Sequence, residues 1–335
     1  MSERLRDWHK VAGRHDLPWQ HQGPYATWVS EIMLQQTQVS VVIPYYLRFM
    51  EAFPTIKTLA AAPQDRVLAH WAGLGYYARA RHLHHAAKQV MAEFGGTIPQ
   101  TLDALVSLKG IGRSTAGAIQ SLGWKRHGVI QDGNVRRVLA RLHAIEGDLL
   151  STRVQSALWR LAETYTPTDG DDAAVHTQAI MDLGALLCTR HAPKCAACPL
   201  QRDCQALKDG RTHLLPTPKK TIAKPTIEWF VLGLRNSEGA LWCSRRPERG
   251  IWGGLYCPPT GASLHTLLTE CGLSVDIEWN EGPTLSHAFS HFSVYLRYVD
   301  ILVADFELSG PGAWITPEAY DIGLPAPIKR LVGWD

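Results

Sequence analysis

The sequence predicts a protein of two domains, an all-α domain followed by an α+β domain. The chain has 335 residues, which exceeds the usual size of a single domain. Apolar residues recur at helical spacing through the first part of the chain, whereas several later segments are typical of β-strands. The stretch LLPTPKKTIAKP, rich in proline and lysine, separates these two patterns at residues 214–225.

The first part is predicted to consist of helices joined by short turns that contain glycine or proline. We expect helices at residues 26–39, 64–71, 78–93, 101–107, 114–122, 133–143, 151–164 and 173–187. Residues 1–220 carry 26 Lys and Arg against 18 Asp and Glu. This basic character is compatible with a nucleic-acid partner, although a solvated surface produces the same balance of charge.

The second part is acidic and combines strands with a helix. Residues 221–335 carry 8 Lys and Arg against 13 Asp and Glu. The segments EWFVLGLRN and GALWCSRR are typical of a β-hairpin around Ser237-Glu238-Gly239. We also expect a helix near residues 263–271 and strands near 275–279 and 292–303.

The sequence contains no signal for membrane insertion or secretion. No run of eighteen apolar residues occurs, and the N-terminus MSERLRDWHK lacks an apolar signal core. We therefore expect a cytoplasmic protein. Its domains are predicted at residues 1–213 and 226–335, with a linker at 214–225 that acts as a semi-rigid tether.

Four of the seven cysteines are crowded into 17 residues with the spacing C-x6-C-x2-C-x5-C. They are Cys188, Cys195, Cys198 and Cys204. Four thiolates in so short a loop suit zinc or an iron-sulfur cluster. Zinc sites more often use two close cysteine pairs and this loop has one, so we favour a 4Fe-4S cluster, with zinc as the alternative. The other cysteines are expected to be ordinary buried residues.

The stretch LKGIGRSTAGAI at residues 108–119 places Gly110 and Gly112 in a tight turn that opens a helix. Glycines let backbone N–H groups approach an anion closely. The chain lacks the third glycine of a dinucleotide fingerprint and the Gly-Lys-Ser/Thr of a P-loop. A helix-hairpin-helix turn that grips a DNA phosphate fits better, and such a turn positions DNA without reading its sequence. Its apolar underside is expected to consist of Leu105, Leu108 and Ile111.

Two acidic residues have both a structural and a functional interpretation. Asp132 precedes a helix expected to begin near Asn134, so an N-cap worth about 1 kcal/mol is the simpler interpretation. Glu31 shares the helical spacing i, i+4 and i+7 with Gln35 and Gln38, beside an apolar face. A polar stripe usually faces solvent, but one without Lys or Arg, interleaved with Met and Leu, can also line a cleft.

Five segments together resemble the MutY family of adenine DNA glycosylases, which belongs to the helix-hairpin-helix superfamily that includes endonuclease III. They are SEIMLQQTQV, GLGYYARARHL, LKGIGRSTAG, DGNVRRVLAR and the four-cysteine loop, in the family's order and spacing over nearly all of residues 1–210. The resemblance implies a helix-hairpin-helix glycosylase domain over residues 1–213 with a 4Fe-4S loop at 188–204. It also implies a Nudix-like α+β domain over residues 226–335.

The resemblance also implies a mechanism, in which Glu31 is the acid on N7 of adenine and Asp132 is the anion facing C1′ of the sugar. Glu31 then requires a desolvated pocket, whereas N–H groups at the helix start hold Asp132 ionised. Ser114 stands where related lyases have a lysine, so we expect base removal with little or no strand cleavage. Asn134 either donates a hydrogen bond in the sugar pocket or only shapes the helix start. The pocket residues are expected to be Trp19, Trp28, Met33 and Leu34.

The second domain is similar to a Nudix fold at GIWGGLYCPPTG, but the following helix offers only Glu270 as a carboxylate. One carboxylate cannot build the magnesium site of a Nudix hydrolase, so a role in recognition is expected. The resemblance implies that Phe289, Ser290 and His291 meet 8-oxoguanine opposite the adenine, within a stretch that we expect to be a strand. It further implies that two residues of the first domain lie against this base, namely Tyr76, which stacks on it, and either Gln35 or Gln36.

These observations predict a monofunctional glycosylase that flips adenine out of duplex DNA and removes it opposite 8-oxoguanine, with guanine as a second opposite base. The partner is double-stranded DNA, the expected state is a monomer at the nucleoid, and other repair proteins are candidate partners. The alternatives are an endonuclease III-like enzyme for oxidised pyrimidines, a non-catalytic iron-sulfur sensor of DNA damage, and a working Nudix hydrolase. Ser114 and the presence of the second domain weigh against the first, the presence of both Glu31 and Asp132 weighs against the second, and the single carboxylate of the helix after the Nudix-like stretch weighs against the third.

Overall fold

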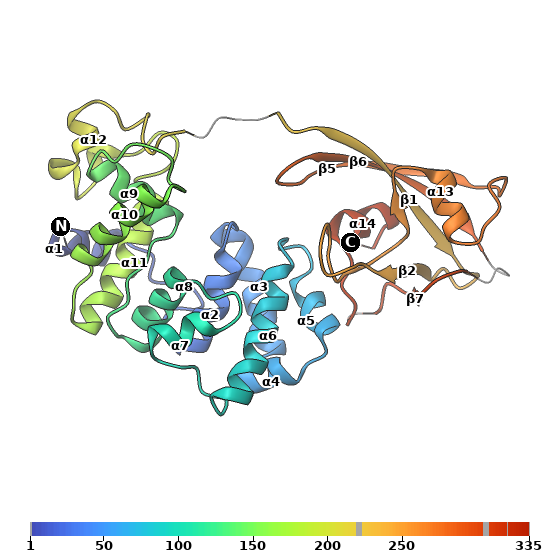
Figure 1. Ribbon diagram of the computed structural model, residues 1–335, viewed down its shortest axis with the longest axis horizontal. Helices are drawn as coiled ribbons and strands as arrows, with labels where there is room; N and C mark the ends of the chain where they lie inside the picture. The colour runs from blue at the N-terminus through green and yellow to red at the C-terminus, as the bar shows by residue number, and fades with distance from the viewer. Residues whose placement is uncertain (1, 219–222, 304–307, 320, 335) are drawn as a thin grey trace. The chain divides into compact units, whose positions relative to one another are not determined.

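The computed structural model describes residues 2–218, 223–303, 308–319 and 321–334. Its chain forms two compact units, the first from Met1–Ala60 and His85–Thr221 and the second from Ala61–His84 and Ile222–Asp335 (Figure 1). The helical segment 61–84 thus packs with the C-terminal part of the chain. Because packing and sequence pattern divide the chain differently, the boundaries at residues 213 and 226 stay predictions.

Helices make up the regular structure as far as Lys208. In chain order they are α1 (Ser2–Ala12), α2 (Gly23–Leu34), α3 (Val39–Ala52), α4 (Ile56–Ala61), α5 (Gln64–Trp71), α6 (Ala78–Glu93), α7 (Leu102–Ser107), α8 (Arg113–Ala118), the π-helical turn η1 (Ile119–Gly123), α9 (Gly133–Leu142), α10 (Thr152–Tyr165), α11 (Gly170–Leu186), the single turns η2 (Cys195–Ala197) and η3 (Gln201–Asp203), and α12 (Gln205–Lys208). The prediction of an all-α first part is confirmed. No helix of the described residues is long and apolar enough to span a bilayer.

The predicted helix at residues 26–39 is wrong at its C-terminal end. Helix α2 stops at Leu34, and Gln36 adopts a left-handed backbone with φ +58° that cannot continue a helix. Gln38 then caps the N-terminus of α3. Sequence reasoning also missed α1, α3 and α4; in α3 the β-branched residues and an internal Pro44 weaken the helical signal.

Helices α9, α10 and α11 share the core of the first unit. Apolar residues from all three helices are fully buried there, among them Leu139, Leu158 and Leu183. The partly buried Cys188, Cys198 and Cys204 pack against the same core. The cysteine loop is therefore attached to the helix whose first turn carries Asp132.

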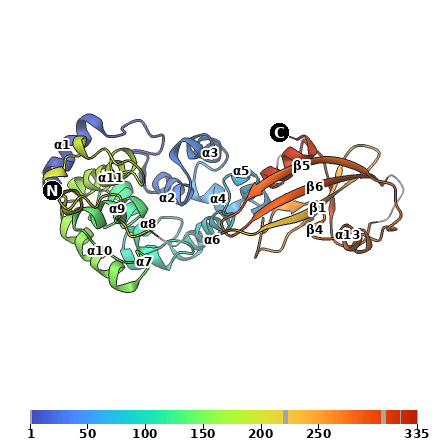
Figure 2. The same cartoon turned by 90° about the horizontal axis from the view of Figure 1, so that it is seen from above.

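The C-terminal part of the second unit is built on a mixed sheet. Its described strands are β1 (Thr226–Arg235), β2 (Leu241–Arg245), β3 (Tyr256–Cys257), β4 (Thr260–Gly261), β5 (Asn280–Ala288), β6 (Ser293–Leu302) and β7 (Ala313–Ile315), and its helices are α13 (Leu264–Glu270) and α14 (Ala326–Val332). The strand order in the sheet is β3-β2-β1-β6-β5, and in addition β4 pairs with β1 and β7 pairs with β2. Strands β1 and β6 are parallel over their whole length, as Figure 2 shows. The α+β prediction is confirmed.

Two details of the predicted strands differ from the structure. Residues 275–279 are not a strand, because β5 begins only at Asn280. The stretch 286–295 is also not one strand: it ends β5, turns through residues 289–292 and enters β6. Ser290 and His291 therefore lie in a turn, and the expectation of a strand there is wrong. The hairpin of β1 and β2 and the helix near residues 263–271 are confirmed, as is burial of the three scattered cysteines.

Candidate functional site

Glu31 lies in the last turn of α2 and is only partly exposed. The neighbouring Trp28 and Met33 are fully buried. Burial, together with the smaller effect of the nearby negative charge of Asp132, raises the pKa of the Glu31 carboxyl from 4.5 to about 8. Glu31 therefore retains its proton at neutral pH, which a general acid requires.

Asp132 is the N-cap of α9, as its sequence context predicts. Its Oδ1 accepts a hydrogen bond from the Val135 N–H at 2.7 Å. Burial raises the pKa of Asp132, although N–H groups of the first helical turn and the charges of Arg137 and Arg136 oppose this shift. The net shift is upward because desolvation outweighs these groups, and ionisation of Asp132 by the N–H groups stays a prediction. These groups still favour the charged form of Asp132 over that of Glu31, which has no such support.

Asn134 joins Asp132 to the interior of the first unit. Its Nδ2 donates to Asp132 Oδ2 at 3.4 Å, and its Oδ1 accepts from Arg137 Nη2 at 2.7 Å. Arg137 also donates to the carbonyls of Gly184 at 2.6 Å and Cys188 at 2.7 Å. A Cβ on Gly184 would lie 2.5 Å from Asn134 Cβ, so glycine is needed for this close approach. The aspartate is therefore oriented by a chain of hydrogen bonds that ends at the first cysteine of the loop.

Ser114 lies one hydrogen bond from the backbone that carries Asp132. Its Oγ accepts from the N–H of Gln131 at 2.9 Å. The structure therefore brings together the position at which related lyases have lysine and the candidate carboxylate. A hydroxyl held in this way has an ordinary structural use, and it has no amine with which to form a Schiff base.

The glycine-rich turn between α7 and α8 has the shape expected for phosphate binding. Gly110 has φ +83°, a conformation that side chains rarely adopt, and Gly112 is the N-cap of α8 with open space around its Cα. Both glycines are exposed. The predicted apolar underside is buried, and it consists of Leu105, Leu108 and Ile111.

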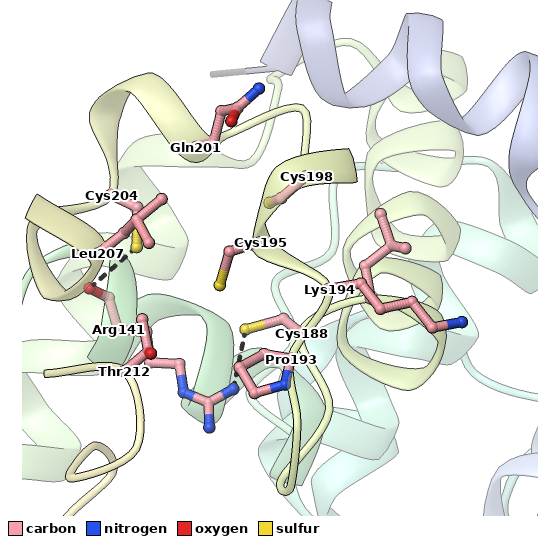
Figure 3. Close-up of a pocket in the computed structure, with 11 residues that line it drawn as sticks. Arg141, Cys188, Pro193, Lys194, Cys195, Cys198, Gln201, Cys204, Leu207 and Thr212 are labelled. Atoms are coloured by element: carbon pink, nitrogen blue, oxygen red, sulfur yellow. Dashed lines mark hydrogen bonds between the residues drawn. The ribbon is translucent and has the colours of Figure 1, made fainter. Parts of the chain in front are cut away.

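The four crowded cysteines line one cavity, as Figure 3 shows. Arg141 of α9, which is buried, enters the same cavity and donates from Nη1 to Cys188 Sγ at 3.4 Å. It also donates to the carbonyls of Thr189 at 2.7 Å and Leu215 at 2.8 Å. A single buried cation thus fixes the loop backbone beside the thiols.

The chemistry of this cavity fits a metal centre with four thiolate ligands. Burial raises the pKa of Cys198 to about 11 and raises that of Cys195 and Cys204, and the negative charge of Cys188 adds to each shift. A metal centre offsets both effects, because its positive charge stabilises thiolates. Among the described residues no three metal-ligating side chains converge on a single ion position. The four thiols instead line the walls of one cavity.

Tyr76 and Ser290 meet within the second unit. The Tyr76 hydroxyl and Ser290 Oγ are 2.9 Å apart and share a hydrogen bond. Tyr76 is 46% exposed and has φ +49°, a left-handed backbone that is unusual for an aromatic residue. Arg79 supports this turn by donating to the Gly75 carbonyl at 3.1 Å. The structure thus places together two residues that are 214 positions apart and that the family resemblance assigns to the same base.

The turn at residues 289–292, here called the reader turn, exposes Ser290 and His291 while its phenylalanines pack inward. The Phe289 N–H donates to the Phe292 carbonyl at 2.8 Å, and Lys224 Nζ donates to the Phe289 carbonyl at 2.9 Å. The two phenylalanine rings lie 4.8 Å apart. Exposed polar tips on a packed aromatic base are suited to contact with a ligand.

The remaining predicted contacts lie in the first unit. Trp19 is buried and packs edge-on against Tyr46 of α3 at 5.3 Å. Gln35 and Gln36 belong to the turn between α2 and α3 and do not extend the Glu31 helix, so the proposed stripe of Glu31, Gln35 and Gln38 is wrong. Gln36 is exposed.

Sequence reasoning missed the arginines that connect these sites. Arg137 and Arg141 are four residues apart on α9 and therefore share a face. That spacing beside a cysteine loop was an available signal for a cationic partner of the thiols. The acceptors, however, are backbone carbonyls of distant segments, which no side-chain pattern reveals.

Comparison with known proteins assigns both parts of the chain. Residues 29–164 match the family described as HhH-GPD superfamily base excision DNA repair protein, and residues 230–333 match the NUDIX domain. A thermostable thymine-DNA glycosylase is 27% identical with a TM-score of 0.55, covering 62% of this chain and 95% of that one. Endonuclease III from a DNA complex, at 20% identity and a TM-score of 0.53 over 62% of this chain and 94% of that one, shares the fold.

Curated relatives extend the similarity over the whole chain. The adenine DNA glycosylase of Buchnera aphidicola subsp. Schizaphis graminum is 36% identical over 99% of this chain and 97% of its own. That of Buchnera aphidicola subsp. Baizongia pistaciae is 34% identical over 98% and 95%. The human adenine DNA glycosylase is 43% identical over 67% of this chain and 42% of its own. The chain belongs to the adenine DNA glycosylase family.

Proposed function

We propose that the chain removes adenine paired with 8-oxoguanine from duplex DNA by hydrolysing the N-glycosidic bond of a flipped adenine. Family membership makes the chain an adenine DNA glycosylase of base excision repair. The finer proposal concerns the opposite base and the residues that act. It is supported by the pair of carboxyls in the first unit and by the Tyr76–Ser290 pair in the second.

Glu31 acts as the general acid in this proposal. With a pKa of about 8 its carboxyl is protonated at pH 7, and it donates this proton to N7 of the flipped adenine. Protonation makes the base a better leaving group as the bond to C1′ breaks. Trp19 and Trp28, both buried, belong to the apolar surroundings proposed to favour the neutral acid.

Asp132 stabilises the positive charge that develops on the sugar. The sugar becomes positively charged as the glycosidic bond breaks. This charge beside Asp132 favours the ionised form of the carboxyl. Asn134 holds the carboxylate at Oδ2 while the Val135 N–H holds Oδ1. Water then adds to C1′, and the proton that it releases restores the neutral Glu31 carboxyl. Ser114 supplies no amine for a Schiff base, so the proposed enzyme lacks lyase activity.

Ser290 distinguishes the opposite base. The oxidised base presents an N7–H donor where guanine presents an acceptor. A hydroxyl has two lone pairs, so Ser290 Oγ accepts from N7–H while it keeps the Tyr76 hydroxyl as a partner. Tyr76 stacks on this base, Phe289 and His291 flank it, and Gln35 or Gln36 approaches it from the turn after α2.

The remaining parts hold the DNA and the protein frame. The exposed turn at Gly110 and Gly112 binds one phosphate of the DNA backbone. Cys188, Cys195, Cys198 and Cys204 hold a 4Fe-4S cluster. The bound cluster would hold the four cysteine side chains of the loop together. Arg137 and Arg141 tie that loop to α9, whose first turn presents Asp132.

The observation that carries the proposal is the raised pKa of Glu31 beside Asp132. Single-turnover base release should be measured on duplexes containing adenine opposite 8-oxoguanine, guanine or thymine, and on a thymine glycol duplex. We expect fastest adenine release opposite 8-oxoguanine, slower release opposite guanine, and none from the other two. Borohydride should trap no covalent complex.

Each proposed element has its own contrary result. Release of thymine glycol instead of adenine would assign the chain to oxidised pyrimidines. Equal rates opposite 8-oxoguanine and guanine would remove the lesion specificity while leaving the glycosylase. A borohydride-trapped complex would show that another amine replaces the lysine that is absent at Ser114.

A further inference from the structure

We infer that Arg81 is a positioning residue that presets the reader turn and so contributes to the preference for 8-oxoguanine over guanine. The inference rests on the proposed function, because it concerns how the Tyr76–Ser290 pair is held. Arg81 lies on the first turns of α6, five residues after Tyr76, within the second unit. It has no place in the adenine chemistry described above.

Arg81 binds two backbone carbonyls of a distant loop. Its Nη1 donates to the Gly253 carbonyl and its Nη2 to the Glu248 carbonyl, each at 2.6 Å. Both hydrogen bonds have a charged donor, which makes them stronger than neutral ones. They join residues that are 172 and 167 positions apart in the sequence. Arg81 is only partly exposed. The guanidinium therefore closes residues 247–254, here called the clamp loop, onto α6.

The clamp loop is closed by its own backbone hydrogen bonds, so the bonds from Arg81 to two of its carbonyls restrain the whole loop. The Gly254 N–H donates to the carbonyls of Arg246 and Pro247, both at 3.2 Å. Gly254 has φ +81°, and a Cβ there would lie 3.2 Å from Leu68 Cδ1 and 3.6 Å from Arg81 Cδ. A side chain at Gly254 would therefore be strained by the positive φ and would press on Leu68 of α5, whereas Arg81 of α6 lies at ordinary contact distance.

Trp252 of the clamp loop packs against the reader turn, so the position of the loop affects the position of the turn. It is 5% exposed and has φ +55°, a strained conformation for a large side chain that its surroundings must maintain. Its ring lies 5.7 Å from Phe289 and 6.4 Å from Trp229. Phe289 directly precedes Ser290.

These contacts form a closed path with two connections between α6 and the reader turn. One is the Tyr76–Ser290 hydrogen bond at 2.9 Å, and the other runs from Arg81 through Trp252 to Phe289. A lone hydrogen bond between exposed hydroxyls is weak. The Arg81 connection keeps Ser290 near Tyr76 while Ser290 Oγ also accepts from the opposite base, so less ordering is needed on binding.

The test compares Arg81→Ala with the wild-type protein in single-turnover adenine release opposite 8-oxoguanine and opposite guanine. We expect the ratio of the two rates to fall about threefold, with most of the loss on the 8-oxoguanine duplex. Arg81→Lys should recover part of the ratio, because an ammonium can reach one carbonyl but not both. The lysine variant also keeps the test usable if the alanine variant folds poorly.

Two comparisons separate positioning from a general role in folding. Arg66→Ala removes another arginine of the segment 61–84, whose contact with Asp321 at 3.5 Å is exposed, and it should leave the ratio within twofold. Arg81→Ala in a Ser290→Ala background should cause no further loss of the ratio, because Arg81 acts through Ser290.

Equal loss on both duplexes would overturn the inference, since Arg81 would then serve the whole enzyme. Losses from Arg81→Ala and Ser290→Ala that multiply would also overturn it. Failure of the proposed function is recognised separately: the wild-type protein itself would show no preference for 8-oxoguanine.

Discussion

The carboxyl pair of the first unit and the hydroxyl pair of the second solve different electrostatic problems. Glu31 and Asp132 both have raised pKa values because burial disfavours their charges. Tyr76 and Ser290 are exposed and share a neutral hydrogen bond. Bond cleavage needs a desolvated acid and a charge partner, whereas discrimination needs one atom accessible to the opposite base. Changes at the first pair should therefore alter rates far more than changes at the second alter preference.

The largest effect is expected from Asp132→Asn. Asparagine caps a helix as well as aspartate does, so the substitution removes charge with little loss of helix stability. Losing one preorganised electrostatic partner typically costs on the order of a hundred-fold to a thousand-fold in rate. We expect a loss of this size in single-turnover adenine release, for 8-oxoguanine and guanine duplexes alike.

Thermal unfolding and duplex affinity provide the control for Asp132→Asn. Both should stay near the wild-type values. A variant with wild-type turnover would show that the carboxyl is only a helix cap, even though the family assignment would remain.

The pH dependence tests Glu31 directly. Because its pKa is about 8, kcat/KM should fall tenfold per pH unit once the pH exceeds about 8. On the acid side the rate should fall as Asp132 becomes protonated, at a pH above its ordinary 3.8. Glu31→Gln should be slow at every pH and should lose the alkaline limb. An unchanged alkaline limb in that variant would assign the limb to another group.

The same shift predicts the sign of a stability effect. The folded protein retains the Glu31 proton up to about pH 8, whereas the unfolded chain releases it near 4.5. Its contribution to stability is therefore fully present below pH 4.5 and is lost as the pH rises through 8, by up to about 1.4 kcal/mol per pH unit. Denaturant titrations of the wild-type protein and Glu31→Gln should differ by this slope.

An intermediate effect is expected at Arg137, which connects Asp132 to the cysteine loop. Arg137→Met removes the bonds to Asn134, Gly184 and Cys188 and a positive charge that lowers the pKa of Asp132. We expect about tenfold slower adenine release. The acid limb of the pH profile should also move to higher pH.

Arg160→Met is the matched control for Arg137, because it removes an exposed arginine from α10 in the same unit. It should leave both the rate and the acid limb unchanged. If Arg137→Met slowed the reaction without moving the acid limb, Arg137 would act on the shape of the site and not on the charge of Asp132.

The sequence predicted local structure better than contacts between distant segments. Asp132 was identified as a helix cap because its hydrogen bond to Val135 spans three residues. The glycine turn was identified for the same reason. Helix α2 was predicted to be too long because glutamine has no residue-type preference that would have indicated the left-handed backbone of Gln36. The reader turn was mistaken for a strand because its phenylalanines and serines alternate as strand residues do.

The family resemblance supplied what local pattern could not. It assigned Tyr76 and Ser290 to one base, and the hydrogen bond between them is consistent with that assignment. Neither the sequence pattern nor the family resemblance predicted the roles of Arg81 and Arg137, because each binds backbone carbonyls of remote segments. Such acceptors have no side-chain identity and therefore leave no trace in the sequence around them.

The smallest effect is expected from Ser290→Ala. The substitution removes the acceptor for N7–H and the partner of Tyr76, but an exposed neutral hydrogen bond contributes modestly. We expect the rate ratio for 8-oxoguanine over guanine to fall about fivefold, with adenine release opposite guanine changing far less. His291→Ala, which changes the other exposed tip of the reader turn, should lower the ratio less because it leaves that acceptor in place. A ratio unaffected by Ser290→Ala would show that Ser290 does not discriminate between the two bases, and Tyr76 would then be the residue of the pair that recognises the lesion.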